Sequence, residues 1–325
     1  MPNKIVFFNH YHRGDLHTHK EFVRQIMREV KDFKFEYLHF NHSKLTRDLD
    51  IPKVGDPSHL DAKTPFYQDE GVLYVNTWIG CHWDIFCEHG GINMNSLWHQ
   101  WQKIFEMINS YFQTSLKLYD EKEFYLPTID FSRFNVKSVD EFLEFTKDRK
   151  RMLLCNGVPK SGQSFNSNMQ DFVEDLASKY PNFCFICTDK FTTTTENIFF
   201  TDDIIMDTDI QEKRAPWEDR EFNNCDLLEI SYLSENCDII VGKNSGPFVF
   251  CETKNNYMDQ RKKFVSFNVS WGIGKAPTET MSNGLELKCD YKIVPITGVG
   301  GSMHQLSGQD VLDITRALET AVNSV

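Results

Sequence analysis

The stretch CDIIVGKNSGP, residues 237–247, joins an apolar run to a polar turn that contains glycine and proline. Its run of Ile239, Ile240 and Val241 is typical of a buried parallel strand, and Pro247 presets the backbone for the first turn of a helix. The first N–H groups of such a helix have no partner within it, and together with the helix dipole they attract phosphate. The stretch therefore predicts a strand–turn–helix corner that suits a nucleotide-type ligand.

The remaining chain repeats this alternation of strands and helices. We expect strands at residues 4–8, 35–40, 72–75, 151–155, 183–187, 198–200, 238–241 and 263–267. Helices are expected at residues 21–30, 96–112, 139–146, 168–180, 225–235 and 309–322 and after Gly246, with a polar turn at 9–19 and a linker at 126–134. Such alternation implies mostly parallel sheets with right-handed crossovers.

The length of 325 residues exceeds what one ordinary core accommodates. We therefore predict an α/β fold of two doubly wound, Rossmann-like domains that face a cleft. The first domain would span residues 1–147 and the second residues 148–325, with the last helix as a candidate to pack back on the first domain.

Composition narrows the class of protein. The net charge of −12 argues against general nucleic-acid binding, which depends on Lys and Arg to neutralise phosphates. No window approaches the roughly 20 apolar residues of a membrane span, and the N-terminus lacks a signal-peptide pattern. Nine scattered cysteines fit reduced thiols better than a disulfide framework. These features predict a cytoplasmic globular protein without a transmembrane segment.

In their order along the chain, three short motifs resemble the GT-B glycosyltransferases, and within them the heptosyltransferase-like group. These motifs are RGDLHT at residues 13–18, NGVPKSG at 156–162, and DLLE at 226–229 followed by the stretch at 237–247. The chain departs from the group's pattern at Asn244, where the group has an acidic residue, and at Val249, where it has a histidine. The proline usual after the group's first loop is also absent near Lys20. The resemblance implies the GT-B architecture and an inverting, metal-independent transfer of a sugar from a nucleotide-sugar donor to a glycan or lipid-linked glycan acceptor, with no further cofactor.

Asp15 is the expected catalytic residue. It follows the first strand, at the edge where open α/β sheets form binding crevices, and a carboxylate there can take the proton of an attacking hydroxyl. The resemblance implies the same role for Asp15. The alternative is that it caps the following helix. The other predicted substrate-binding residues are Gly14, His17, Lys160, Ser161, Gly162, Ser164, Glu229, Lys243, Asn244, Ser245 and Gly246.

Other functions stay open from the residues alone. The changes at Asn244 and Val249 suit a non-catalytic sugar- or nucleotide-binding protein on the same fold. The histidines of the first loop, His10, His12 and His17 among them, suggest a metal-dependent hydrolase, although no Cys pairing or His-Glu-x-x-His spacing accompanies them. A sugar-nucleotide epimerase is a further alternative. Trp78 and Trp83, after the third strand, offer aromatic rings to an acceptor sugar, and core packing explains them equally well.

Overall fold

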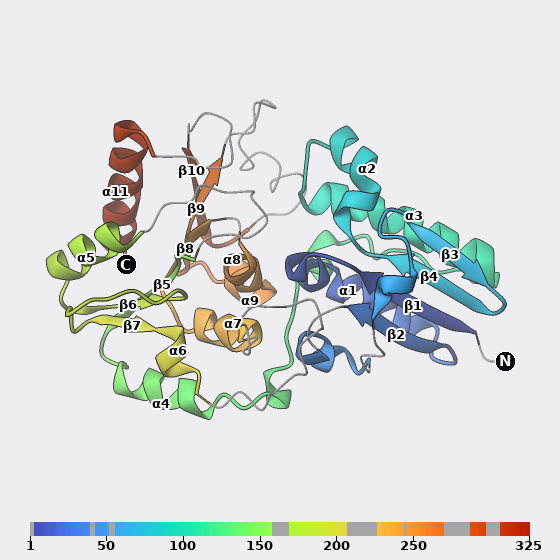
Figure 1. Cartoon of the computed structure of the whole chain (residues 1–325), viewed down its shortest axis with the longest axis horizontal. Coiled ribbons are helices and arrows are strands. Elements are labelled where there is room, and N and C mark those ends of the chain that lie inside the picture. Colours follow the sequence, from blue (N-terminus) through green and yellow to red (C-terminus); the bar gives the residue numbers. More distant parts are fainter. Residues whose placement is uncertain are drawn as a thin grey trace. The chain divides into compact units, whose positions relative to one another are not determined.

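The computed structural model describes residues 3–39, 43–51, 56–157, 169–206, 226–243, 245–269, 287–296 and 306–325. These form two compact units, and the chain passes from the first to the second between Arg133 and Phe134 (Figure 1). That point lies within the predicted linker at 126–134. The division differs from the predicted domain limit at residue 147 by one helix, α4 (Lys137–Phe145), which belongs to the second unit.

The first unit is built on a four-stranded sheet of order β2-β1-β4-β3. Its elements are β1 (Lys4–Asn9), α1 (Arg13–Glu29), β2 (Lys34–His39), β3 (Phe66–Asp69), β4 (Val72–Asn76), α2 (Trp83–Glu88) and α3 (Met94–Phe112). Strand β1 pairs in parallel with both β2 and β4, whereas β3 is antiparallel to β4. The predicted parallel arrangement is confirmed, with an antiparallel edge strand added.

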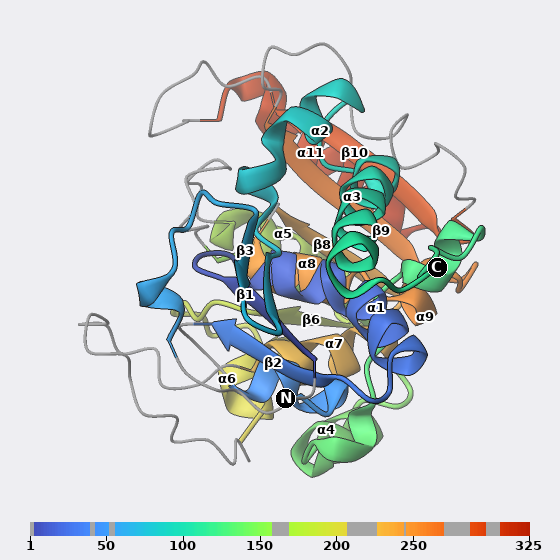
Figure 2. The same cartoon turned by 90° about the vertical axis from the view of Figure 1, so that its right-hand side faces the viewer.

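Helices α1 and α3 lie side by side over one face of this sheet (Figure 2). The indole of Trp101 on α3 stacks on Phe22 of α1, with 4.9 Å between ring centroids, and lies 6.2 Å from the ring of Phe7 on β1. The indole Nε1 also donates a hydrogen bond to Nδ1 of His19, at 2.9 Å. Burial of these aromatic faces fixes both helices on the sheet.

The second unit contains a six-stranded, wholly parallel sheet of order β10-β9-β8-β5-β6-β7. Its strands are β5 (Lys150–Cys155), β6 (Phe183–Cys187), β7 (Ile198–Phe200), β8 (Ile239–Lys243), β9 (Lys263–Val269) and β10 (Asp290–Ile296). Its helices, besides α4, are α5 (Gln170–Lys179), α6 (Thr201–Ile204), α7 (Leu227–Glu235), α8 (Gly246–Cys251), α9 (Lys254–Tyr257) and α11 (Gly308–Val322). Numbered from β5 in chain order, the strands follow the classic Rossmann order.

Helices cover both faces of the second sheet (Figure 1). Helices α5 and α11 pack on the face that carries Met152 and Val241, and α11 contributes Ile314 and Leu318 to that core. Helix α8 packs on the other face, where Phe248 lies against Gly242. The α/β class and the doubly wound character of this unit, both predicted from the sequence, are confirmed.

Several elements differ from the prediction, and the short helices α2, α6 and α9 were not expected. Helix α1 begins at Arg13, so residues 13–19 are helical and not a turn. The start of α1 was missed because the prediction relied on apolar residues at buried positions. Here the polar residues His17, His19 and Lys20 occupy fully buried positions. Strands β3 and β10 were not predicted; both lie at sheet edges, where β10 tolerates Pro295 because an edge residue needs no second ladder partner.

Candidate functional site

The first candidate site lies at the carboxyl edge of the first sheet, where β1 and β4 end beside each other. Phe8 of β1 pairs with Asn76 of β4 at this edge. From β1 the chain crosses through α1 to β2 on one side, and it later returns to β4 on the other side. Open α/β sheets bind their ligands at such a change of direction.

Two buried asparagines shape the loops that leave these strands. The side-chain Oδ1 of Asn9, the last residue of β1, accepts a hydrogen bond from the backbone N–H of Tyr11 at 2.8 Å. Asn76, the last residue of β4, does the same for Trp78 at 3.0 Å. Each amide thus turns the backbone two residues beyond its strand. The same kind of bond therefore fixes the loops after both strands.

Asp15 lies in the first turn of α1 and is buried, with 9% of its surface exposed. Its Oδ2 accepts a hydrogen bond from the backbone N–H of Ile79, at 3.0 Å, across 64 residues of sequence. Burial raises the pKa of Asp15 to about 7, while the Ile79 N–H and Asn9 partly oppose this shift. A carboxyl group whose pKa lies near neutrality, at the switch point of a sheet, is suited to accept a proton. The sequence left open that Asp15 caps the following helix. In the structure its carboxylate accepts instead from the backbone N–H of Ile79, in the segment after β4.

The histidines of the predicted first loop are distributed over several environments. His17 and His19 are fully buried within α1, and burial, together with the nearby His82, lowers the pKa of His19 to about 3. The Nδ1 atom of this neutral His19 accepts the bond from Trp101. His10 contacts the carbonyl of Pro57 through Nε2, at 2.9 Å. Across the described ranges, no three His, Cys, Asp or Glu side chains gather as a group that could hold a metal ion. Gly14 occupies the first turn of α1 beside Asp15.

The second candidate site lies at the carboxyl edge of the second sheet, between β5 and β8. These strands are neighbours, and Cys155 of β5 pairs with Gly242 of β8. From β5 the chain adds β6 and β7 on one side, and from β8 it adds β9 and β10 on the other. This edge is therefore the topological switch point of the Rossmann order. A Cβ atom on Gly242 would lie 2.5 Å from the Cδ2 atom of Phe248 and 2.9 Å from the Cβ atom of Cys155. Glycine is therefore required here for α8 to approach the sheet.

Several predicted residues meet at this edge. Lys243 ends β8 and is buried, and burial lowers its pKa to about 8, against the opposing charge of Asp189. Ser245 is the N-cap residue of α8; among the residues that the structure describes, its buried Oγ has no hydrogen-bond partner. Gly246 follows, and a Cβ atom there would meet no described residue within 4 Å.

An asparagine again organises the neighbouring strand ends. Asn156, just after β5, accepts a hydrogen bond from the backbone N–H of Asp189 and donates one to its carbonyl, both at 2.9 Å. This exchange ties the end of β5 to the loop after β6. This role of Asn156 was not predicted, although its position directly after a strand was the available signal in the sequence.

The other predicted residues divide into two groups. Glu229 lies on α7 with only 2% of its surface exposed, so it is not on a solvated helix face. Lys160, Ser161, Gly162, Ser164 and Asn244 lie outside the described residues. The binding roles of all these residues stay predictions.

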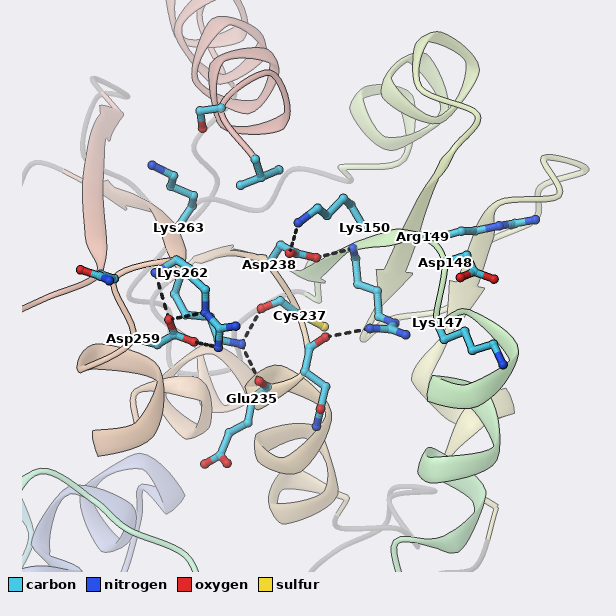
Figure 3. Close-up of a pocket in the computed structure, with 16 residues that line it drawn as sticks. Lys147, Asp148, Arg149, Lys150, Glu235, Cys237, Asp238, Asp259, Lys262 and Lys263 are labelled. Atoms are coloured by element: carbon cyan, nitrogen blue, oxygen red, sulfur yellow. Dashed lines mark hydrogen bonds and ion pairs between the residues drawn. The ribbon is translucent and has the colours of Figure 1, made fainter.

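A surface hollow of about 680 Å³ lies at the opposite, amino edge of the second sheet (Figure 3). It is lined by segments 147–151, 235–238 and 259–263, which contain several lysines and arginines. These cations have internal partners: Lys150 pairs with Asp238 at 3.0 Å, and Lys262 donates to three backbone carbonyls at the end of α7 and just beyond it. The positive charges of Lys150 and Lys262 are therefore already paired with groups at the ends of a strand and a helix. We place the candidate sites at the carboxyl edges of the sheets instead.

No family model and no curated protein matches this chain. Among solved structures, it is similar to a family 9 glycosyl transferase from Veillonella parvula, at 11% identity and a TM-score of 0.48, covering 99% of this chain and 98% of that one. It is also similar to the Escherichia coli heptosyltransferase WaaC with ADP-2-deoxy-2-fluoro heptose, at 7% identity and 0.45, covering 98% and 99%. A third is the UDP-GlcNAc 2-epimerase from Neisseria meningitidis bound to UDP-GlcNAc, at 10% identity and 0.46, covering 99% and 92%. At these values, we infer function from the chain's own residues.

Proposed function

We propose that this protein is a glycosyltransferase that moves a sugar from a nucleotide-sugar donor to a glycan-type acceptor. The observation that carries the proposal is Asp15, a buried carboxyl group at a sheet switch point whose pKa is raised to about 7. An acceptor hydroxyl needs such a base when its oxygen attacks the anomeric carbon. The order of motifs that resembles the heptosyltransferase-like group supports the same assignment.

In the proposed reaction, the acceptor oxygen forms a bond to the anomeric carbon while the bond from that carbon to the diphosphate breaks. Asp15 takes the hydroxyl proton, and the electron pair of the broken bond stays with the nucleotide diphosphate. Lys243 and the turn at Ser245 and Gly246 would stabilise this developing charge, which counts most in a site of low dielectric constant. Inversion at the anomeric carbon and independence from metal belong to the proposal.

Two further parts of the proposal concern the setting. The first unit would hold the acceptor and the second the donor, since Asp15 and the Ser245 turn lie in different units. No helix in the described part of the chain has the length and apolar character needed to cross a membrane. We propose a cytoplasmic location and a donor that carries a nucleoside diphosphate.

A thermal-shift screen of the purified protein tests the donor half. The panel is ADP, UDP, GDP and their common sugar conjugates, applied to the wild type, to Ser245→Trp and to Asp15→Asn. A ligand that binds only the folded state stabilises it by about 2.7 kcal/mol at a hundredfold excess over its dissociation constant. We expect one nucleotide to raise the melting temperature of the wild type and of Asp15→Asn, and to have a weaker effect on Ser245→Trp.

Two results would contradict the proposal. If no nucleotide shifts the melting temperature, or if Ser245→Trp responds as the wild type does, the switch point of the second sheet is not the donor site. The second result is that a nucleotide binds, but the wild type releases no nucleoside diphosphate from any nucleotide sugar offered with glycan acceptors. The protein is then better described as a non-catalytic binding protein.

A further inference from the structure

An aromatic pair stands at the carboxyl edge of the first sheet, beside Asp15. The rings of Tyr11 and Trp78 are 4.6 Å apart between centroids and tilted by 54°. The Tyr11 side chain is 51% exposed, so its ring is accessible to a ligand. Proton transfer to Asp15 does not require either ring.

The two rings come from the loops that follow two neighbouring strands, β1 and β4. Tyr11 follows β1 and Trp78 follows β4, and the side chains of Asn9 and Asn76 fix the two loops through matching bonds to the N–H groups two residues on. Gly80 completes the arrangement, since a Cβ atom there would lie 2.2 Å from the Cζ2 atom of the Trp78 ring. Only glycine at residue 80 allows the indole to lie where it does.

The same segment positions the carboxyl group. Ile79, directly after Trp78, donates its backbone N–H to Oδ2 of Asp15 at 3.0 Å. The ring of His12 lies 6.2 Å from that of Tyr11, and burial lowers the pKa of His12, which favours its neutral form. The aromatic surface and the proposed base are therefore held in fixed relation by one short stretch of backbone.

We infer that Tyr11 and Trp78 form a platform for the ring of the acceptor sugar. One face of a pyranose presents C–H groups, which pack on the electron-rich face of an aromatic ring, while its rim carries hydroxyls that a carboxylate can accept from. A sugar ring on this platform presents a hydroxyl toward Asp15. That the bound sugar is the acceptor rests on the proposed function. The binding of a sugar to the platform does not depend on turnover.

Saturation-transfer NMR on the full chain tests the platform. The probes are the methyl glycosides of glucose, galactose, mannose and N-acetylglucosamine. We expect at least one of them to receive saturation from the wild type through its ring protons. Tyr11→Ala, Trp78→Ala and Gly80→Ala should each weaken that binding roughly tenfold, the order expected when a ligand loses an aromatic contact. Phe145→Ala is the matched control, because Phe145 is an exposed aromatic residue of α4, in the second unit.

The outcomes separate the platform from the proposed function. Loss of signal in Tyr11→Ala and Trp78→Ala, with the signal kept in Phe145→Ala and in the conservative Trp78→Phe, supports the platform. Circular dichroism confirms that each variant is folded. If the wild type binds a nucleotide but transfers saturation to none of the glycosides, the platform is rejected and the proposed function is not. Equal signals from all variants also overturn it. Glycoside binding without any nucleotide shift keeps the platform and rejects the transferase.

Discussion

The carboxyl edges of the two sheets occupy the same topological position and carry opposite chemistry. At the first edge, burial raises the pKa of the acid Asp15 to about 7. At the second edge, burial lowers the pKa of the base Lys243 to about 8. Removal from water disfavours the charged form of each group, so the two shifts converge on neutral pH from opposite sides.

The surroundings of these two groups differ as well. Asp15 is accompanied by aromatic rings and two asparagines, whereas Lys243 leads into a turn of small residues, Ser245 and Gly246. The first set suits a neutral ligand with hydroxyls, and the second leaves room for a group with several acceptor oxygens. The fold supplies the location of both switch points, and the residues after each strand supply the chemistry.

The largest expected effect is on turnover at the first edge. Asp15→Asn keeps a side-chain oxygen for the N–H of Ile79 but removes the base. We expect the rate of sugar transfer to fall by about 10²- to 10⁴-fold, the usual contribution of a positioned general base. Steady-state release of nucleotide diphosphate measures this rate.

Donor binding is the control for this variant. The nucleotide-induced shift in melting temperature should be unchanged in Asp15→Asn, because the donor site is assigned to the other unit. A variant that transfers sugar at the wild-type rate would remove Asp15 from the mechanism.

The next effect is on the pH dependence of stability. The folded-state pKa of Asp15 is about 7, against an ordinary value of 3.8, so the folded protein binds more protons than the unfolded chain between these values. The contribution of Asp15 to the free energy of unfolding is thus full below about pH 4 and is lost as the pH rises to about 7. Asp15→Asn should therefore stabilise the protein at pH 8, on the order of 1 to 4 kcal/mol.

Urea unfolding of the wild type and Asp15→Asn at pH 5 and pH 8 measures this difference. The gain from the substitution should be larger at pH 8. Equal differences at both pH values would mean that the carboxyl group is not desolvated in the folded protein.

A smaller, purely steric effect is expected at the second edge. Gly242→Ala places a Cβ atom against the Phe248 ring and the Cβ atom of Cys155, at 2.5 Å and 2.9 Å. Overpacking of this kind costs about 1 to 3 kcal/mol of unfolding free energy. Gly246→Ala is the control, since a Cβ atom there meets none of the residues that the structure describes within 4 Å, and we expect a change within about 0.5 kcal/mol. Thermal unfolding of both variants decides whether close approach of α8 is what requires glycine.

The sequence was sufficient for the second edge and insufficient for part of the first. Residues 237–247 contain a strand, a turn and a helix start in unbroken order, and β8 and α8 follow that pattern. The start of α1 was missed because His19 and Lys20 occupy core positions: Trp101 contacts the first, and the buried Asp48 pairs with the second at 2.8 Å. Such partners are distant in sequence, so a local pattern does not contain them.

The site itself shows the same limit. Asp15 and Ser245 were recognisable from their positions after strands, and the structure places them at the two switch points. The pairing of Tyr11 with Trp78 joins loops 67 residues apart and depends on Gly80, whose role is visible only when the indole is in place. Interactions between two strand ends need the sheet order, and the sequence implies only that the strands exist.

The smallest expected effect concerns the charge of Lys243. Its pKa of about 8 means that the ammonium loses its proton as the pH rises through about 8, and with it the attraction for a diphosphate. Donor affinity should fall by up to about tenfold per pH unit above that value, whereas turnover through Asp15 should rise as the pH passes about 7. Lys243→Met should bind the nucleotide more weakly at pH 7 and show little change between pH 7 and pH 9. Isothermal titration calorimetry with the nucleotide found in the screen measures both affinities, and a wild-type affinity that stays constant over this range would show that Lys243 does not contribute its charge to the donor.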